Sequence, residues 1–503
     1  MQFLWTIQYN KTDHKEIIRL DIFRKARNED NGEMLTYSFE DIGSDSLYEH
    51  LYKCVKKDII SRRIRPGEKL PSKRSFAKNL GISVITVENA YNQLIDEGYI
   101  YSIPKKGFFA ADISSRAEKR PGSITGDIAA VTGESRQYLA DFSGNGSNIG
   151  MFPFTVWSKL LRECLSDYQE ELLVMPPSGG ALVLRRAIAG YLLAFRNMTV
   201  DPEQIIIGAG TEYLYGQLVQ LLGQEKIYGV EDPGFPKTAR VYEASRAKVR
   251  HIPLDSSGIC VEQLEREKVQ VAHISPSHQF PTGRITPISR RYELLGWASR
   301  GEDRYIIEDD YDSEFRMTGK PIPTLMSIDV NERVIYMNTF SKSISNTIRM
   351  SYMVLPKHLM SEYYRRLSFY SCPVTTIIQL TAAKFIEKGY FEKHINRMRN
   401  FYRKQRDLLT ETIKGSPMAA FAEILEEDAG LHFLLRLDIP CTDEEFSGIM
   451  ERQGVRLRGL SEYCWQEENR SQHDFLINYS SLSAEQIVTA INLISKEVVK
   501  LRK

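Results

Sequence analysis

The spacing of hydrophobic positions divides the chain into four regions. Residues 1–44 are polar and show no clear period, whereas hydrophobic residues recur at helical spacing within residues 45–111. Residues 112–140 are rich in Ser, Gly and charged residues and poor in large apolar ones, which is typical of a flexible linker. From residue 141 to residue 503, short apolar runs alternate with helical segments. We therefore predict an N-terminal extension, a small helical domain, a linker and a large domain.

The N-terminal extension allows three interpretations. Its first residues, up to about residue 33, are either a disordered extension, the product of a wrongly assigned start, or a short ordered arm. Met34 opens the segment MLTYSF, close to where we expect an ordered domain to begin. The sequence does not choose among these three.

The helical region has the layout of a helix-turn-helix with a wing. SKRSFAKNL predicts a short helix, GIS a tight turn at Gly81, and VITVENAYNQLIDEGYI a longer helix for which Ser83 is a suitable N-cap. The apolar residues of the longer helix fall on one face: Val87, Ala90, Tyr91, Leu94 and Ile95. Ile85, Glu88, Asn89 and Asn92 are expected to point outward. IYSIPKKGFFAA predicts a two-stranded wing with Gly107 at its turn.

The large domain is predicted to be an α/β fold with a mostly parallel sheet. Its apolar runs are bounded by turn residues and separated by helical segments, a pattern typical of βαβ units. The predicted strands are EQIIIGAG, KIYGVED, VQVAHISPS, RYIIEDD and RVIYMNT.

Composition is that of an ordinary soluble globular protein, with 42% hydrophobic and 26% charged residues. No stretch approaches the roughly 18 apolar residues of a membrane span, and the N-terminus lacks the features of a signal peptide. The six cysteines are scattered without CxxC spacing, which argues against a disulfide framework or a zinc site. We therefore expect a cytoplasmic protein that uses no metal and no membrane.

The net charge of +1 hides a local asymmetry. Residues 45–110 contain twelve Lys or Arg and seven Asp or Glu, so this segment carries +5 and the remainder of the chain −4. A basic helix-turn-helix segment favours double-stranded DNA as a partner. The alternative is a small helical interaction module with a solvated basic face.

Candidate DNA contacts follow from this layout. Basic side chains are expected to contact phosphates: Arg62, Arg63, Lys73, Arg74, Lys105 and Lys106. Outward side chains of the second helix are expected to contact base edges: Thr86, Glu88 and Asn89. The residues that open the two helices and the wing turn complete the set: Ser72, Ser83 and Gly107.

Three chemical groups fall at the ends of predicted strands in the large domain. Asp309 and Asp310 end the run RYIIEDD, and Lys342 lies just past RVIYMNT. The turn GAGT, with Gly210 and Thr211, precedes a helix whose N-terminus suits a phosphate. A carboxylate, an amine nucleophile and a phosphate cradle together indicate pyridoxal 5′-phosphate. Taken singly, each motif is more often a cap, a surface lysine or a common turn.

Arg349 and Tyr311 extend this constellation. Arg349 lies seven residues after Lys342 and could hold the same phosphate with a bidentate fork. The hydroxyl of Tyr311, next to the Asp pair, could hold the phenolate oxygen of the ring.

The sequence resembles a known fusion of two domains. PGEKLPSKRSFAKNLGISVITVENAYNQLIDEGYIYSIPKKGFF is similar to the winged helix-turn-helix of GntR-type transcription regulators. From about residue 141 the chain resembles a fold-type I aminotransferase, and SPSHQFPTGR, IIEDDYDSEFR and TFSKSISNTIRM are close to the MocR/GabR subfamily. Val84 and Glu88 replace residues that are often basic in the family, so the operator sequence cannot be transferred.

The resemblance implies roles for individual residues. Lys342 would form the Schiff base, Asp309 would pair with the pyridine nitrogen, and Tyr311 would meet the phenolate oxygen. Phe235 would stack on the ring. The phosphate would be surrounded by Ala209, Gly210, Thr211, Thr339, Ser341 and Arg349.

Three positions depart from residues found in enzymes or relatives of this fold. Phe280 stands where those enzymes have an asparagine, as is usual in the regulator subfamily, and Gln279 or His278 could substitute for it. Met175 replaces a tyrosine found in many relatives, and Lys237 replaces a carboxylate-binding arginine found in some. Arg456 and Arg458 are either effector carboxylate partners or part of a basic loop.

The expected function is a pyridoxal phosphate-dependent transcription regulator. It would sense a small amino compound, or pyridoxal phosphate itself, and by the resemblance would bind paired half-sites as a homodimer. One alternative is a working aminotransferase with an accessory DNA-binding module. Another is a DNA-binding protein whose enzyme-like scaffold is inactive and needs no cofactor.

Overall fold

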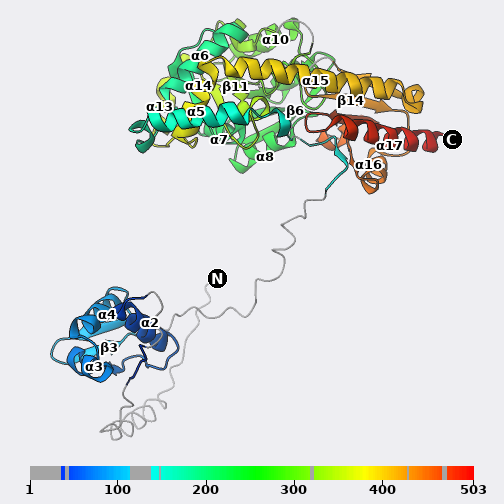
Figure 1. Ribbon diagram of the computed structural model, residues 1–503. Coiled ribbons are helices and arrows are strands. Elements are labelled where there is room, and N and C mark those ends of the chain that lie inside the picture. The colour runs from blue at the N-terminus through cyan, green and yellow to red at the C-terminus, as the bar shows by residue number, and fades with distance from the viewer. Residues whose placement is uncertain are drawn as a thin grey trace, which may run out of the picture. The chain divides into compact units, whose positions relative to one another are not determined.

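The computed structural model describes residues 35–39, 45–113, 137–144, 146, 149–317, 322–427, 430–466 and 473–503. The chain divides into two compact units, one up to Glu134 and one from Ser135 onward, and we describe each by itself (Figure 1). Most of the predicted N-terminal extension and residues 114–136 of the predicted linker lie outside the described residues.

The first unit is a winged helix-turn-helix. Its three strands form an antiparallel sheet in the order β1-β3-β2. The elements are α2 (Leu47–Ile60), β1 (Lys69–Leu70), α3 (Lys73–Leu80), α4 (Val84–Asp96), β2 (Ile100–Ile103) and β3 (Gly107–Ala110). The helix starts are encoded locally, because Ser72 caps α3 by accepting from the Ser75 N–H and Ser83 caps α4 by accepting from the Thr86 N–H. Gly81 ends α3 at a φ of +67°.

The predicted face of α4 forms the core of this unit. Val87, Ala90, Tyr91 and Leu94 are fully buried, Ile95 is partly buried, and Ile85 is exposed. The Tyr91 hydroxyl donates to the Pro71 carbonyl at 3.0 Å, which ties α4 to the start of α3. Residues 35–39 also pack on this core, and the Tyr37 hydroxyl donates to Asp58 at 2.8 Å. Described structure therefore begins upstream of residue 45.

The second unit is built on an eight-stranded, mostly parallel sheet, as predicted. The strand order is β5-β12-β11-β10-β9-β6-β7-β8, and β12 and β8 run antiparallel to their neighbours. The strands are β5 (Ile205–Gly208), β6 (Ile227–Asp232), β7 (Lys248–Asp255), β8 (Gly258–Ile259), β9 (Val271–Ile274), β10 (Tyr305–Asp309), β11 (Val334–Thr339) and β12 (Ser351–Val354). All five predicted strands are present.

Helices cover both faces of this sheet, and the strand side chains divide accordingly. Along β11, Ile335 and Met337 pack into one hydrophobic cluster and Tyr336 into another on the opposite face. The helices are α5 (Phe154–Asp167), α6 (Leu182–Arg196), α7 (Thr211–Leu222), α8 (Pro236–Ala244), α9 (Val261–Arg266), α10 (Ile288–Ser299), α11 (Leu325–Ile328), α12 (Phe340–Ser343), α13 (Lys357–Leu367) and α14 (Thr376–Glu387). Single-turn 3₁₀ helices are η1 (Ile149–Met151), η2 (Glu171–Leu173), η3 (Pro202–Gln204) and η4 (Ser313–Phe315).

A smaller C-terminal sheet completes the second unit. It has the strand order β13-β14-β17-β16, and the long helix α15 runs toward it from the larger sheet (Figure 1). The elements are α15 (Tyr390–Lys414), η5 (Pro417–Phe421), β13 (Ala422–Leu425), β14 (His432–Leu437), α16 (Asp443–Arg452), β15 (Val455–Arg456), β16 (Arg458–Gly459), η6 (Leu460–Tyr463), β17 (Asp474–Asn478) and α17 (Ala484–Arg502). β15 pairs in parallel with β4 (Ala140–Asp141).

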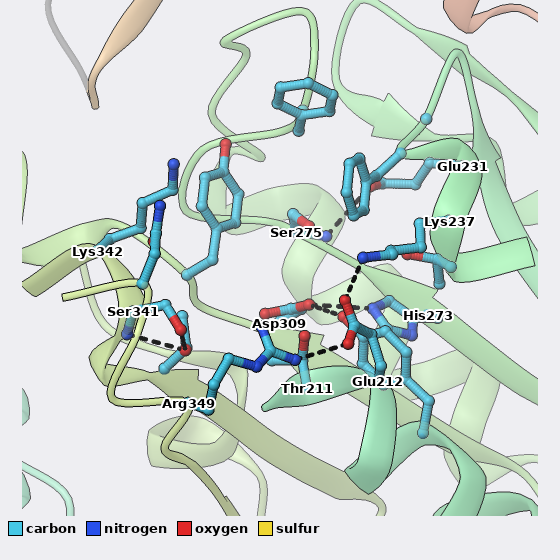
Figure 2. A pocket seen from close by; sticks show the side chains of 18 residues that line it. Thr211, Glu212, Glu231, Lys237, His273, Ser275, Asp309, Ser341, Lys342 and Arg349 are labelled. Atoms are coloured by element: carbon cyan, nitrogen blue, oxygen red, sulfur yellow. Dashed lines mark hydrogen bonds and ion pairs between the residues drawn. The ribbon is translucent and has the colours of Figure 1, made fainter. Parts of the chain in front are cut away.

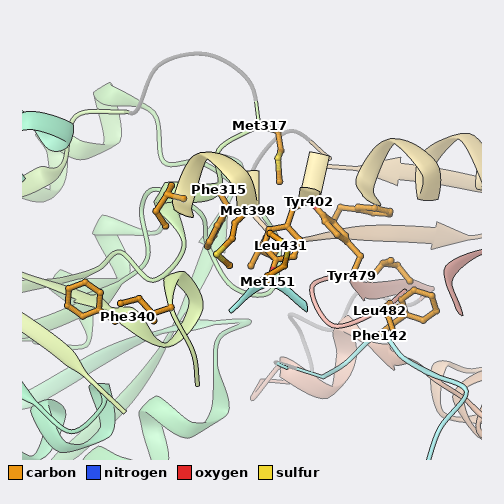
Figure 3. Packing of buried hydrophobic residues seen from close by; sticks show 14 of the residues in the cluster. Phe142, Met151, Phe315, Met317, Phe340, Met398, Tyr402, Leu431, Tyr479 and Leu482 are labelled. Atoms are coloured by element: carbon orange, nitrogen blue, oxygen red, sulfur yellow. The ribbon is translucent and has the colours of Figure 1, made fainter. Parts of the chain in front are cut away.

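One hydrophobic cluster joins the two parts of this unit. Figure 3 shows Phe315 of η4 and Phe340 of α12, which follow β10 and β11, in the same cluster as Tyr402 of α15 and Tyr479 beyond β17. Continuous packing of this kind holds the C-terminal sheet in a fixed position beside the ends of β10 and β11. Among the described residues, no helix combines the length and the apolar character that crossing a bilayer requires.

Candidate functional site

A cavity of about 330 Å³ opens at the carboxyl ends of the central strands (Figure 2). It lies where β10 and β11 end beside the N-terminus of α7, the position at which open α/β sheets bind ligands. Its lining residues are Thr211, Glu212, Tyr215, Glu231, Gly234, Phe235, Lys237, Thr238, His273, Ser275, Phe280, Asp309, Tyr311, Thr339, Ser341, Lys342, Asn346 and Arg349. The three motifs that the sequence placed at separate strand ends therefore meet in one cavity.

Lys342 is held at the cavity by a short helix that begins immediately after β11. Thr339 caps this helix, α12, by accepting a hydrogen bond from the Ser341 N–H at 3.1 Å. Burial lowers the pKa of Lys342 from 10.5 to about 8, because the charged ammonium is poorly solvated there. A lysine with this pKa carries a substantial fraction of neutral, nucleophilic amine near neutral pH.

Asp309 presents one unused carboxylate oxygen. Its Oδ2 accepts from the Tyr215 hydroxyl at 2.6 Å and lies 3.4 Å from Nε2 of His273. Its Oδ1 is buried and has no hydrogen-bond partner among the described residues. A buried acceptor left open in this way suits a protonated ring nitrogen of a ligand.

The predicted phosphate cradle is assembled, but an acidic residue occupies part of it. Gly210 and Thr211 start α7, and Nη2 of Arg349 lies 3.5 Å from the Ala209 carbonyl oxygen. The same Nη2 forms an ion pair with Oε2 of Glu212 at 2.7 Å, and Lys237 pairs with the other oxygen of Glu212 (Figure 2). The two cations lower the pKa of Glu212, which keeps it ionised. An incoming phosphate would have to replace Glu212 as the partner of Arg349.

The small hydroxyls of the lysine segment are connected to one another. Thr339 donates to Ser341 at 3.0 Å and accepts from Ser351 at 2.8 Å. These hydroxyls and the start of α7 provide uncharged donors for a phosphate.

Two aromatic rings line the ring-binding part of the cavity. Phe235 and Phe280 are in edge-to-face contact, with centroids 5.5 Å apart. Phe280, at the position of the asparagine expected in enzymes of this fold, therefore offers no hydrogen bond to a ligand. The Tyr311 hydroxyl also faces this region.

Gln279 lies outside the lining of the cavity. It is buried, its amide nitrogen donates to the carbonyls of Pro233 and Phe280, and its amide oxygen accepts from Thr282. These bonds use Gln279 to hold the loop between β9 and α10. His278 is buried beside Tyr311, with its Nδ1 3.2 Å from the hydroxyl oxygen.

The three candidate effector residues have different positions. Lys237 lines the cavity, whereas Arg456 and Arg458 lie outside its lining. Arg456 lies 3.5 Å from Asp141, and Arg458 lies 3.7 Å from Glu462.

Most candidate DNA contacts of the first unit lie on α3, on α4 or at the wing, whereas Arg62 and Arg63 follow the end of α2. Arg62, Arg74, Lys105 and Lys106 are exposed, and Thr86 is half-buried at the start of α4. Lys73 forms an ion pair with Glu88 at 2.7 Å, which neutralises one phosphate candidate and occupies one base-edge candidate. Arg63 lies 3.8 Å from Asp58, and Asn89 is exposed.

Comparison with known proteins assigns both units. The model of bacterial regulatory proteins of the gntR family matches residues 47–110, and the model of aminotransferases of class I and II matches residues 140–494. The HTH-type transcriptional regulator YdeL of Bacillus subtilis is 40% identical over 82% of this chain and 89% of its own. The probable rhizopine catabolism regulatory protein MocR of Rhizobium meliloti is 29% identical over 89% of this chain and 92% of its own length.

This chain belongs to the MocR/GabR subfamily of GntR-type transcription regulators. It is a DNA-binding transcription regulator with an aminotransferase-like domain, as the sequence predicted. A solved archaeal alanine:glyoxylate aminotransferase has the same fold as the second unit, with a TM-score of 0.65, 23% identity and coverage of 73% of this chain and 91% of that one. The pyridoxine biosynthesis regulator PdxR of Corynebacterium glutamicum is a further relative, 28% identical over 83% of this chain and 88% of its own length.

Several lining residues of this MocR/GabR regulator were missed from the sequence. Tyr215 lies one helical turn after Thr211 on α7, and His273 lies on the inward face of β9, so their spacing could have identified them. Glu231, at the end of β6, has a pKa raised to about 8 by burial, so it is largely protonated at neutral pH. Glu212 gave no signal, because acidic residues are common at helix starts.

Proposed function

We propose that this regulator binds pyridoxal 5′-phosphate in the cavity around Lys342 and uses it to sense an amino compound. The observation that carries the proposal is the meeting of Lys342, the open oxygen of Asp309 and the Arg349 cradle in one cavity. When bound, pyridoxal phosphate supplies an aldehyde that condenses reversibly with primary amines. The sensing reaction thus needs an amine nucleophile and a rigid site more than it needs rapid turnover.

Each residue of the chain has a separate task in this proposal. Lys342, whose pKa of about 8 leaves part of it neutral, attaches the cofactor covalently and gives way to an incoming amine. Asp309, oriented by Tyr215 and His273, accepts from the protonated ring nitrogen. Arg349, Thr211 and Ser341 bind the phosphate. Phe235 and Phe280 exclude water from the ring.

The replacement of Lys342 by an effector amine is the signal. Released from the cofactor, Lys342 regains its ability to take up a proton, so charge changes at the ends of β10 and β11. Such a change can favour one of two arrangements of the protein and thereby alter its affinity for DNA. We propose a homodimer that presents two winged helices to paired half-sites of the operator.

The chemistry of the cavity limits the effector to a small primary amine. Lys237 lines the cavity and pairs with Glu212, so the carboxylate of an amino acid would bind Lys237 by replacing Glu212 as its partner. Two relatives are named as regulators of different pathways, rhizopine catabolism (a probable regulator) and pyridoxine biosynthesis. Pyridoxal phosphate itself is the alternative effector for this chain.

A titration of the purified, cofactor-loaded protein with candidate amines tests the proposal. We expect each effective amine to shift the visible absorbance of the bound cofactor and to change the affinity for operator DNA over the same concentration range. Lys342→Ala should lose the covalently bound band, while Lys357→Ala, at an exposed lysine on α13, should keep it. Steady release of a keto acid would assign the chain to the working aminotransferases instead. Failure of the wild-type protein to bind the cofactor would refute the proposal.

A further inference from the structure

A buried pair of residues lies behind Tyr311, outside the lining of the cofactor cavity. Nδ1 of His278 lies 2.9 Å from Oδ2 of Asp312 and 3.2 Å from the Tyr311 hydroxyl oxygen. His278 and Asp312 are 3% and 2% exposed. One ring nitrogen is therefore shared by a carboxylate and by the tyrosine that faces the ligand.

The imidazole ring of His278 packs closely against Gly430 and His432. A Cβ at Gly430 would lie 2.0 Å from Cε1 of His278 and 2.6 Å from Oδ2 of Asp312, so a glycine is required there. The ring of His432, on β14, lies 4.4 Å from the His278 ring. Burial and the neighbouring His278 and Lys342 hold the pKa of His432 well below its usual value, so His432 is neutral.

The proton on Nδ1 of His278 is fixed by its stronger partner. A carboxylate only accepts, so the 2.9 Å contact places the hydrogen on Nδ1, directed at Asp312. That leaves no lone pair on Nδ1 for the Tyr311 proton. The other ring nitrogen, Nε2, has no hydrogen-bond partner among the described residues.

His278, Asp312 and His432 also have the ligand types of a transition-metal site. The surrounding charges argue against that use. A void of about 20 Å³ beside His278 and Asp312 is lined by Arg196 and Arg316, so two guanidinium groups lie where a cation would have to be stabilised. The cluster fits a neutral, hydrogen-bonded role.

We propose that Asp312, acting through His278, directs the Tyr311 hydroxyl proton into the cofactor cavity. Nδ1 of His278 cannot accept the Tyr311 proton while it donates to Asp312, so Tyr311 would keep its single proton for the phenolic oxygen of the cofactor. Asp312 and His278 are positioning residues, and the inference rests on the proposed function. It explains how the site keeps one oriented donor although Phe280 has replaced the asparagine. Burial and the nearby Asp312 and Asp309 raise the pKa of Tyr311 well above 10, so the donor persists at every physiological pH.

The pH midpoint of the visible absorbance of the cofactor-loaded protein tests this role. A donor to the phenolic oxygen stabilises its negative charge and lowers the pH at which the lysine-linked nitrogen loses its proton. Tyr311→Phe should therefore raise the midpoint by about one pH unit. Asp312→Ala should also raise it, because Nδ1 of His278 can then accept the tyrosine proton. Loss of the Asp312 charge alone predicts a shift in the opposite direction, since a nearby anion stabilises the protonated nitrogen.

A second substitution separates positioning from a general structural effect. The double variant Asp312→Ala, His278→Ala also lacks the imidazole that competes for the Tyr311 proton. Its pH midpoint should therefore return to the wild-type value or fall below it. Asp312→Asn gives a milder version of the single change, should Asp312→Ala not fold. A lowered or unchanged midpoint in Asp312→Ala, or a double variant as high as the single one, would overturn the inference. Absence of any cofactor band in the wild-type protein would instead refute the proposed function.

Discussion

Gly210 determines whether Arg349 can reach a phosphate at the start of α7. It adopts a φ of +97°, and a Cβ added there would lie 2.5 Å from Nη2 and 3.0 Å from Cζ of Arg349. Gly210→Ala would therefore push the guanidinium away. Because Nη2 is the far end of a flexible side chain, Arg349 moves and the start of α7 stays in place.

The size of the effect follows from the contact that is lost. A hydrogen bond that involves a charged group contributes about 1.5–3 kcal/mol, and each 1.4 kcal/mol is about a factor of ten in affinity. The Arg349 side chain is 50% exposed, so solvent screens its charge and we expect the lower end, about a tenfold weaker binding of pyridoxal phosphate. Gly210 has a φ of 97° and a ψ of 162°, a combination essentially restricted to glycine, so alanine there lowers the free energy of unfolding by a further ~1–3 kcal/mol.

Gly216→Ala is the matched control, because Gly216 lies in the middle of α7 and has no atom within 4 Å of an added Cβ. This change should leave cofactor affinity unchanged and stabilise the helix by about 1 kcal/mol. Equilibrium titration with pyridoxal phosphate, followed by its visible absorbance, gives the affinity, and urea unfolding gives the stability. If Gly210→Ala binds the cofactor within twofold of the wild-type protein, Arg349 does not hold the phosphate and our assignment of the cradle is wrong.

Three further predictions concern other parts of the chain. The rate of covalent cofactor attachment should increase as pH rises to about 8 and then level off, because the pKa of Lys342 is lowered to about 8. Stopped-flow absorbance measures this rate, and a rate that still rises at pH 10 would contradict the prediction. Because the pKa of Lys342 is lower in the folded than in the unfolded chain, the free energy of unfolding of the cofactor-free protein should rise between about pH 8 and 10.5, and Lys342→Met should abolish that rise. Lys105→Ala at the wing should weaken binding to all DNA sequences and reduce the slope of log affinity against log salt concentration by about one. Thr86→Ala should instead alter the preference among DNA sequences. Fluorescence anisotropy measures both effects.

The main chemical groups of the site could be predicted from the sequence because ligand sites of open α/β sheets lie at the carboxyl ends of the strands. Asp309 and Lys342 follow successive apolar runs, and the carboxyl ends of neighbouring parallel strands must meet at one edge. The structure confirms that β10 and β11 are adjacent, with Asp309 opposite Met337.

The partners of these groups could not be read in the same way. Glu212 contacts Arg349 across 137 positions of sequence, and His432 reaches His278 from the C-terminal sheet. Such contacts arise from the packing of whole elements, which no local pattern specifies. Gln279 was predicted to be a cofactor ligand because it lies next to Phe280 in the sequence. Its side chain instead donates hydrogen bonds to backbone carbonyls.

The winged helix shows the same division. The sequence pattern predicted α3 and α4, and it also predicted the N-cap Ser83 and the buried face of α4. The ion pair between Lys73 and Glu88 joins α3 to α4 and occupies the charged groups of both side chains. Their residue types alone did not indicate this pairing. Residues 35–39 pack on the same core although they show no periodicity.

The central claim is that an amine acting at Lys342 controls DNA binding. Its most direct test is the affinity for a duplex selected from random sequences by the cofactor-loaded protein, measured by fluorescence anisotropy with and without an amine. Wild-type protein and Lys342→Ala are compared in the presence of equal cofactor. We predict that the amine changes the dissociation constant of the wild-type protein by at least fivefold, a typical lower limit for allosteric coupling, and leaves that of Lys342→Ala unchanged. An equal change in both proteins, or none in the wild-type protein over the range in which its absorbance shifts, would contradict the account.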